Sequence, residues 1–274
     1  MPLDKAKAIL KDVQQGNLKP IYFLMGEEPY YIDLIANYIE KKVLSEEEKG
    51  FNQMILYGRD VTIDDIVGNA KRYPMMADKQ VVIVKEAQDL SRTIDNLLPY
   101  VVDPQPSTVL VICYKYKKLD ARKKITKEIK KRGELFESKK LYDDKVPNWI
   151  RQILAAKGYT ISPKSSQMLT EFLGNDLSKI SNELDKLLML IPAGSQITPE
   201  LIEENIGISK DFNNFELQKA IGDRNVEKAF RIIQYFGQNQ KNHPVIVTCA
   251  ILYGFFTKVM KYHALTNKKD AARS

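Results

Sequence analysis

Five short apolar blocks, separated by stretches with helical spacing, most strongly constrain how the first half of this chain can fold. The blocks lie at 21–25, 55–57, 81–84, 108–113 and 134–137. Strands that are apolar throughout are buried on both faces, which is typical of a parallel sheet covered by helices. Residues 30–44 and 61–70 repeat apolar side chains at helical spacing, and Thr62 or Asp64 is placed to begin the second helix. The expected fold class of this half is an α/β parallel-sheet domain.

Beyond about residue 143 the strand pattern ends and only helical spacing remains. Ser162 before Pro163 and Thr198 before Pro199 are typical of helix starts, because proline fits the first helical position. The expected helices lie at 147–156 (with the single tryptophan), 163–173 (ended by Gly174), 177–191, 199–206 (ended by Gly207), 215–221, 226–236 and beyond Pro244. At 274 residues the chain exceeds the usual size of one core. We expect an α/β domain at 1–143 and helical domains at 144–208 and 209–274.

The sequence gives no sign of secretion or of membrane insertion. The start, MPLDKAKAIL, has no apolar signal-peptide region. The longest apolar run, 245–256, contains Thr248 and Gly254 and is too short to span a bilayer, so we expect a buried helix. Cys113 and Cys249 lie far apart and outside any metal-ligand pattern, which favours a reduced cytoplasmic protein without structural zinc.

Positive charge is concentrated in one segment, residues 115–132. It holds ten Lys or Arg against two acids, a net charge of +8, whereas the rest of the chain carries −1. On a helix from Leu119, Ile125 and Ile129 would face inward and the lysines outward. One explanation is a solvated helix face; the other is sequence-independent contact with phosphates. The candidate nucleic-acid-binding residues are Lys123, Lys124, Lys127 and Lys130.

The turn after the first strand occupies the place of a phosphate-binding loop but lacks its residues. A GxxxxGK[ST] pattern begun at Gly26 would need glycine, lysine and a hydroxyl residue where Tyr31, Ile32 and Asp33 stand. Lys85 follows the 81–84 block, where a metal-binding acid would be needed. We therefore expect no bound nucleotide and no cofactor.

Other catalytic or metal-binding sets are also missing from the sequence. The two histidines, His243 and His263, have no Cys, Asp or second His at ligand spacing. No Ser/His/Asp or Cys/His arrangement can be built from them. We expect no catalytic residue and no metal site.

Two adjacent methionines, Met75 and Met76, follow Pro74 just before the 81–84 block. One explanation folds one or both of them into the core. Neighbouring residues point in different directions, about 100° apart on a helix, so a single core face cannot readily take both. Methionine is flexible and polarizable, which suits a side chain that fills a partner's pocket. The pattern favours an exposed apolar plug over a core position.

Three stretches of the chain together resemble the delta subunit of the bacterial DNA polymerase III clamp loader. They are IYFLMGEEPYYID, YPMMADKQVVIVKEA and the combination of VPNWI with LSKISNELDKL. The similarity runs over the whole chain and is most specific at 20–90 and 146–190. It implies an AAA+-like domain that has no catalysis of its own, followed by a lid domain and a collar domain.

The same resemblance implies a function and a set of partners. The subunit would bind and open the sliding clamp on primed DNA, within a cytoplasmic hetero-oligomer whose sister subunits hydrolyse ATP. It would be part of the DNA polymerase III holoenzyme, a DNA-directed DNA polymerase and thus a nucleotidyltransferase, with no membrane contact. Pro74, Met75 and Met76 stand at the clamp-contacting position, where the family commonly has leucine and an aromatic residue.

Two alternatives and one difference from the family stay open. The chain ends at KKDAARS, where the family continues with further collar helices, so we expect an incomplete collar domain. The alternative functions are an active P-loop-type ATPase and a free-standing nucleic-acid-binding protein that uses residues 115–132. Residues 26–33 argue against the ATPase, and the second alternative would require no protein partner.

Overall fold

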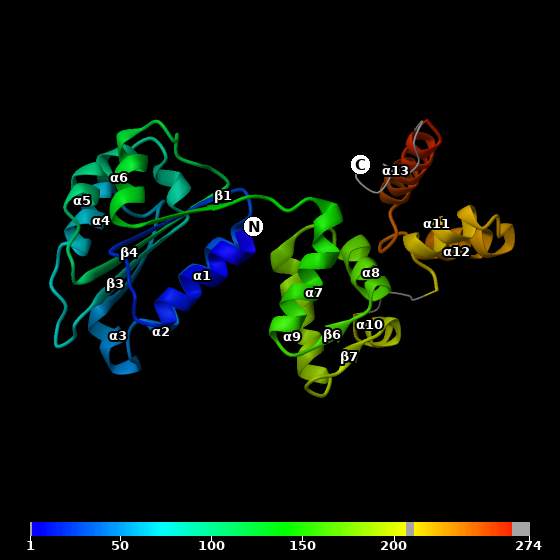
Figure 1. Ribbon diagram of the computed structural model, residues 1–274, viewed down its shortest axis with the longest axis horizontal. Coiled ribbons are helices and arrows are strands. Elements are labelled where there is room, and N and C mark those ends of the chain that lie inside the picture. The colour runs from blue at the N-terminus through cyan, green and yellow to red at the C-terminus, as the bar shows by residue number, and fades with distance from the viewer. Residues whose placement is uncertain (1, 207–210, 265–274) are drawn as a thin grey trace. The chain divides into compact units, whose positions relative to one another are not determined.

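A parallel sheet lies at the centre of the first of two structural units, residues 1–141 and 142–274 (Figure 1). The structure is a computed structural model that describes residues 2–206 and 211–264. Five strands pair in the order β2-β3-β4-β1-β5, and all the pairs are parallel. The strands are β1 (Ile21–Gly26), β2 (Gln53–Tyr57), β3 (Gln80–Lys85), β4 (Thr108–Lys115) and β5 (Glu134–Ser138). Each apolar block of the sequence is a strand, which confirms the expected α/β parallel-sheet fold.

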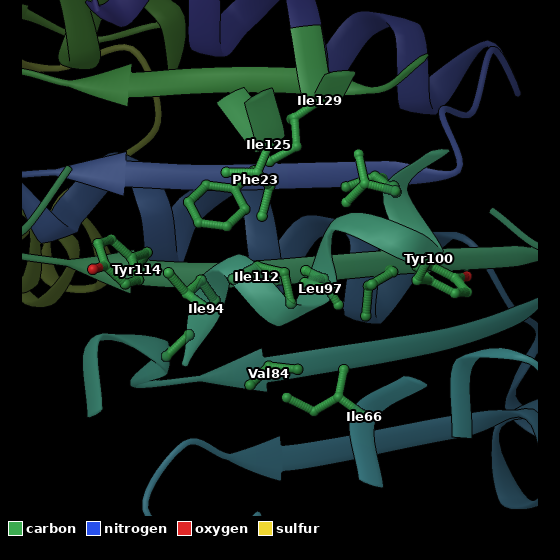
Figure 2. Close-up of a cluster of buried hydrophobic side chains, with 14 of the residues drawn as sticks. Phe23, Ile66, Val84, Ile94, Leu97, Tyr100, Ile112, Tyr114, Ile125 and Ile129 are labelled. Carbon is green, nitrogen blue, oxygen red and sulfur yellow. The ribbon is translucent and has the colours of Figure 1, made fainter. Parts of the chain in front are cut away.

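Helices cover both faces of this sheet (Figure 1). One face is packed by α4 (Ile63–Ala70), the short helix η2 (Ile94–Leu97), α5 (Leu98–Val102) and α6 (Lys124–Arg132). Figure 2 shows side chains of these helices, such as Ile66 and Ile125, meeting Phe23, Val84 and Ile112 of the strands. On the opposite face lie α1 (Pro2–Gln14) and α2 (Pro29–Lys42). Burying each large apolar side chain contributes about 1.5–3 kcal/mol, so this core stabilises the unit.

Helix starts agree with the sequence at α4 and differ at α6. The Thr62 side chain accepts the Asp65 N–H and so caps α4, which decides between the two expected starts. The basic helix α6 begins at Lys124 and not at Leu119, so the expected start is wrong. Leu119 is buried, and Lys123 N–H donates to the carbonyl of Asp120, which makes a turn of residues 120–123.

Three α-helices of this unit had no predicted residue range. They are α1, α3 (Glu46–Asn52) and α5. A capping box starts α3: Ser45 Oγ accepts the Glu48 N–H while the Glu48 carboxylate accepts the Ser45 N–H. The short helix η1 (Ala87–Leu90) follows β3 directly. Asn52, the last residue of α3, has a side chain that reaches the methionine loop.

The second unit is mainly helical, as expected. Its helices are η3 (Asp143–Lys145), α7 (Val146–Ala156), α8 (Pro163–Leu173), α9 (Leu177–Leu190), α10 (Pro199–Ile206), α11 (Asn214–Gly222), α12 (Val226–Gln238) and α13 (Val245–Ala264). A small parallel pair, β6 (Thr160–Ile161) with β7 (Gln196–Ile197), was not expected, because two-residue strands are too short to show a period. Gly207, expected to end α10, and the KKDAARS end lie outside the described residues. A domain boundary at 208/209 stays a prediction.

The long apolar helix α13 differs most from expectation. It is longer than the apolar run that predicted it, with 20 residues, and none of them is buried, so the expected buried helix is wrong. Leu252 packs against the core of α11 and α12, which has only four buried residues and is too small to cover such a helix. Among the described residues, α13 is the one helix whose length and composition would allow it to cross a membrane.

Candidate functional site

The loop that joins α4 to β3, residues 71–79, exposes the two adjacent methionines to solvent. Met76 is fully exposed and Met75 is 61% exposed, whereas Pro74 before them is half-buried. Met76 has φ +53°, in the left-handed region that residues other than glycine rarely adopt. Neither methionine belongs to the core. The loop therefore presents two large apolar side chains, one largely and one fully exposed to solvent.

Further apolar side chains are exposed on the elements beside this loop. Tyr73, in the loop, is 79% exposed, and Phe51, in α3, is 76% exposed. Ile55 and Tyr57 are exposed on β2, the edge strand that pairs with β3. Exposed apolar groups gathered on neighbouring elements are typical of a protein-binding surface.

The backbone of the loop is held by hydrogen bonds although its two methionine side chains are exposed. Asn52 bonds both backbone groups of Met75: its Nδ2 donates to Met75 O at 2.9 Å, and Met75 N–H donates to its Oδ1 at 2.6 Å. Gln80 Nε2 donates to Arg72 O at 2.5 Å and to Thr108 Oγ1 at 2.7 Å. The sequence patterns did not predict the roles of Asn52 and Gln80, because contacts between residues far apart in the chain leave no local signal. The Ser45–Glu48 capping box is the one pattern that could have predicted α3.

The β1–α2 turn, in the place of a phosphate-binding loop, uses its backbone N–H groups within the protein. Gly26 N–H donates to Lys117 O at 3.0 Å, and Glu28 N–H donates to Ser138 O at 3.2 Å. Gly26 has φ +131°, and a Cβ at this position would lie 2.1 Å from Ser138 O. A phosphate loop needs free N–H groups that converge on the ligand. In this turn, the N–H groups of Gly26 and Glu28 are instead hydrogen-bonded to carbonyls of β5 and of the segment after β4.

A lysine and two carboxylates fill the end of the sheet next to this turn. Lys115 Nζ lies 2.9 Å from Asp33 Oδ1 and 2.8 Å from Glu86 Oε1. Burial alone would lower the pKa of Lys115, but its hydrogen bonds with Glu86 and Asp33 outweigh burial and raise this pKa. Burial alone would raise the pKa of Glu86, yet the hydrogen bonds from Lys115 and Gln88 hold it below its usual value. The two carboxylates thus share one cation that the protein itself supplies.

Lys85, the last residue of β3, pairs with the carboxylate of Glu40 at 3.1 Å. A metal-binding acid at this place in the fold is therefore replaced by a cation with its own partner. Within residues 2–206 and 211–264, no group of three or more His, Cys, Asp or Glu side chains could hold a metal ion. His243 is buried and stacks on Phe236 with ring centroids 4.3 Å apart, and burial lowers the pKa of its imidazole. This histidine packs against the rings of Tyr235 and Phe236 in α12.

The four lysines suggested for nucleic-acid binding are all exposed at or near the start and outer face of α6. Ile125 and Ile129 face the core, as expected. Lys123 pairs with Asp95 at 2.5 Å, so part of its charge is already matched. In the described part of the chain, the other three have no ion pair: Lys124, Lys127 and Lys130. They leave a positive surface without any fixed geometry for bases.

A five-stranded parallel sheet covered by helices, followed by a mainly helical unit, defines the class as an α/β protein with an added helical unit. The family model described as DNA polymerase III, delta subunit, matches residues 22–139. A curated Bacillus subtilis (strain 168) protein, DNA polymerase III subunit delta, is 26% identical over 267 residues, which cover 93% of this chain and 76% of that protein. The chain is thus similar to DNA polymerase III delta subunits, over residues 22–139 by the family model and over 93% of its length by this relative.

A solved structure supports the same fold. The Bacillus subtilis DNA clamp loader delta protein matches with a TM-score of 0.64 and 24% sequence identity. The match covers 100% of this chain and 83% of that chain. The resemblance predicted from residues 20–90 and 146–190 is thereby confirmed as a similarity of sequence and of fold.

Proposed function

We propose that this chain is the clamp-loader subunit that binds and opens the sliding clamp, with no catalysis of its own. The observation that carries the proposal is the exposed Met75–Met76 pair on an anchored loop, in a chain similar to delta subunits. Sister subunits would supply ATP hydrolysis within a cytoplasmic hetero-oligomer acting on primed DNA. The exposed helix α13 is consistent with further contacts between subunits.

Apolar burial provides the free energy for the proposed contact. Moving a methionine side chain from water into a partner's pocket contributes about 1.5–3 kcal/mol. Met76 is fully exposed and Met75 largely so, so nearly all of this area is available for binding. The unbranched side chains adapt to a pocket that leucine and an aromatic residue commonly fill in the family. Because the loop backbone is already ordered, little of the gain is lost in fixing it.

The paired turn N–H groups and the Lys115 cluster support a subunit that does not bind ATP. Gly26 and Glu28 have their N–H groups committed to carbonyls of the protein, and Lys115 occupies the charge-neutralising role with Asp33 and Glu86. Calorimetric titration of the whole chain with millimolar ATP and Mg²⁺ should give no saturable heat. Saturable binding that is lost on mutating residues 26–33 would support the P-loop ATPase instead.

Surface plasmon resonance with the purified sliding clamp of the same organism tests the proposal directly. We expect saturable binding by the chain alone, without nucleotide. A chain that binds duplex DNA but not the clamp would favour the free-standing nucleic-acid-binding protein, for which the exposed lysines of α6 are the supporting observation. Binding to neither would contradict both functions.

A further inference from the structure

The side-chain amide of Asn52 forms hydrogen bonds with both backbone groups of one residue of the methionine loop, as a neighbouring strand would. It accepts from the N–H of Met75 at 2.6 Å and donates to its carbonyl at 2.9 Å, a contact between residues 23 positions apart. Asn52 is the last residue of α3 and is 4% exposed, so its amide has little access to water. Its Nδ2 also donates to Glu48 O at 3.2 Å, which ties it to the last turn of α3. The position and direction of this amide are therefore fixed before it contacts the loop.

A second buried amide holds the other side of the loop. Gln80 Nε2 donates to Arg72 O, and Thr108 Oγ1 donates to Ala70 O at 2.7 Å. Residues 72–75 are thus anchored at both ends, whereas Met76 has only solvent around its side chain. The left-handed φ of Met76 follows immediately after the anchored residue. Such a conformation persists only when the surrounding structure holds it.

We propose that Asn52 is a positioning residue for clamp binding, which holds the Met75 backbone so that both methionine side chains are presented before contact. This inference rests on the proposed function of the loop. A loop that is ordered in the free protein loses less conformational freedom on binding than one that must be fixed by the partner. Asn52 does not itself need to touch the clamp, because it acts through the backbone of Met75.

Asn52→Ala removes both hydrogen bonds and tests the proposal. We expect clamp binding by the folded variant to weaken about tenfold, which corresponds to about 1.4 kcal/mol. Hydrogen exchange should show a faster amide at Met75, whose N–H loses its acceptor, while amides of β1 and β4 keep their protection. Asn69→Ala is the matched control, because the side-chain amide of Asn69 donates to Asp65 O within its own helix and not to the methionine loop. This control should bind the clamp like the unmodified chain.

A double-mutant cycle separates the positioning role from a structural one. In the Met75→Ser, Met76→Ser background, Asn52→Ala should cause no further loss of clamp affinity, because there is no longer a plug to position. If the methionine variant binds the clamp normally, the proposed site itself is wrong. If the methionine variant is weakened but Asn52→Ala binds like the unmodified chain, the positioning role is overturned and the proposed site stands.

A second variant covers the case in which Asn52→Ala does not fold. Asn52→Asp keeps the shape and the acceptor for Met75 N–H, but it loses the Nδ2 donor to both Met75 O and Glu48 O and places a carboxylate beside these two carbonyls. We expect an affinity between those of the unmodified chain and Asn52→Ala, with Met75 exchange still protected. If Asn52→Asp bound the clamp as tightly as the unmodified chain, the proposal that both hydrogen bonds hold Met75 would be contradicted. It would also be contradicted if Asn52→Asp lowered clamp affinity by the same factor in the Met75→Ser, Met76→Ser background.

Discussion

Replacing Lys115 with methionine tests whether an internal cation stabilises the degenerate nucleotide site. Lys115 Nζ lies 2.9 Å from Asp33 Oδ1 and 2.8 Å from Glu86 Oε1, and its side chain is only 13% exposed. Removing one partner of a buried ion pair costs about 3–5 kcal/mol. The two carboxylates are 43% and 38% exposed and can regain water, which reduces that cost. We expect Lys115→Met to lower the free energy of unfolding of the first unit by about 2 kcal/mol.

The pH dependence of this loss gives the sharper signature. The folded pKa of Glu86 is lowered, so its contribution is fully present above its unfolded value of 4.5 and disappears as pH falls through the folded pKa. The folded pKa of Lys115 is raised, so its contribution is present below the unfolded value of 10.5 and disappears as pH rises through the folded pKa. The difference between Lys115→Met and the unmodified chain should therefore be constant from about pH 6 to pH 9 and shrink below pH 4.5.

Urea unfolding followed by far-UV circular dichroism, at pH 7 and again near pH 4, measures both effects. Fluorescence of Trp149, the single tryptophan, follows the second unit separately. Lys124→Met is the matched control, because Lys124 is exposed and has no ion pair among the described residues, and it should change stability by less than about 0.5 kcal/mol. If Lys115→Met lowered the free energy of unfolding as little as the control does, or by the same amount at both pH values, the stabilising role of Lys115 would be refuted.

Three further predictions concern other surfaces and the second unit. Changing Lys123, before α6, and Lys124, Lys127 and Lys130, within it, to Gln should weaken DNA binding and reduce the log–log salt slope by roughly 0.9 for each phosphate that is no longer neutralised. Unchanged DNA binding would show that these lysines only form a solvated face. Glu216→Gln should destabilise the second unit by about 2 kcal/mol, because Glu216 is buried and pairs with Lys164 at 2.6 Å and Lys228 at 2.5 Å. Urea unfolding checks this change against Glu227→Gln, whose exposed pair should contribute nothing measurable. One of the two thiols should react with Ellman's reagent in the folded chain, since Cys249 is exposed while burial raises the pKa of the Cys113 thiol to about 12; rapid reaction of both would contradict the buried position of β4.

The strands were predictable because burial on both faces leaves a continuous apolar run in the sequence, as at 81–84 and 108–113. The start of α6 was not, because its lysines suit a helix at any position and a buried Leu119 shifts the start to residue 124. Apolar composition at 245–256 predicted burial of α13, but burial depends on what the rest of the chain supplies to cover it.

The exposure of the two methionines was predictable from the sequence, whereas their role in clamp binding stays a prediction. An apolar pair beside a turn proline marks Met75 and Met76 from local sequence alone. Asn52, in contrast, contacts the loop across 23 residues, and nothing in the composition of α3 reveals the direction of its amide. The missing lysine at Ile32 was visible in the sequence, whereas the arrival of Lys115 from β4 beside Asp33 required the folded sheet.

Clamp affinity of the double variant Met75→Ser, Met76→Ser tests the central claim most directly. Surface plasmon resonance should show a loss of about two orders of magnitude, since each buried methionine contributes about 1.5–3 kcal/mol before the entropy of ordering and about 1.4 kcal/mol is a factor of ten. Met189→Ser, which changes another exposed methionine in α9, should bind normally, and the melting temperatures of all three chains should agree. A melting temperature that falls while the folded double variant still binds the clamp would show that these methionines serve the core and that the clamp contact lies elsewhere.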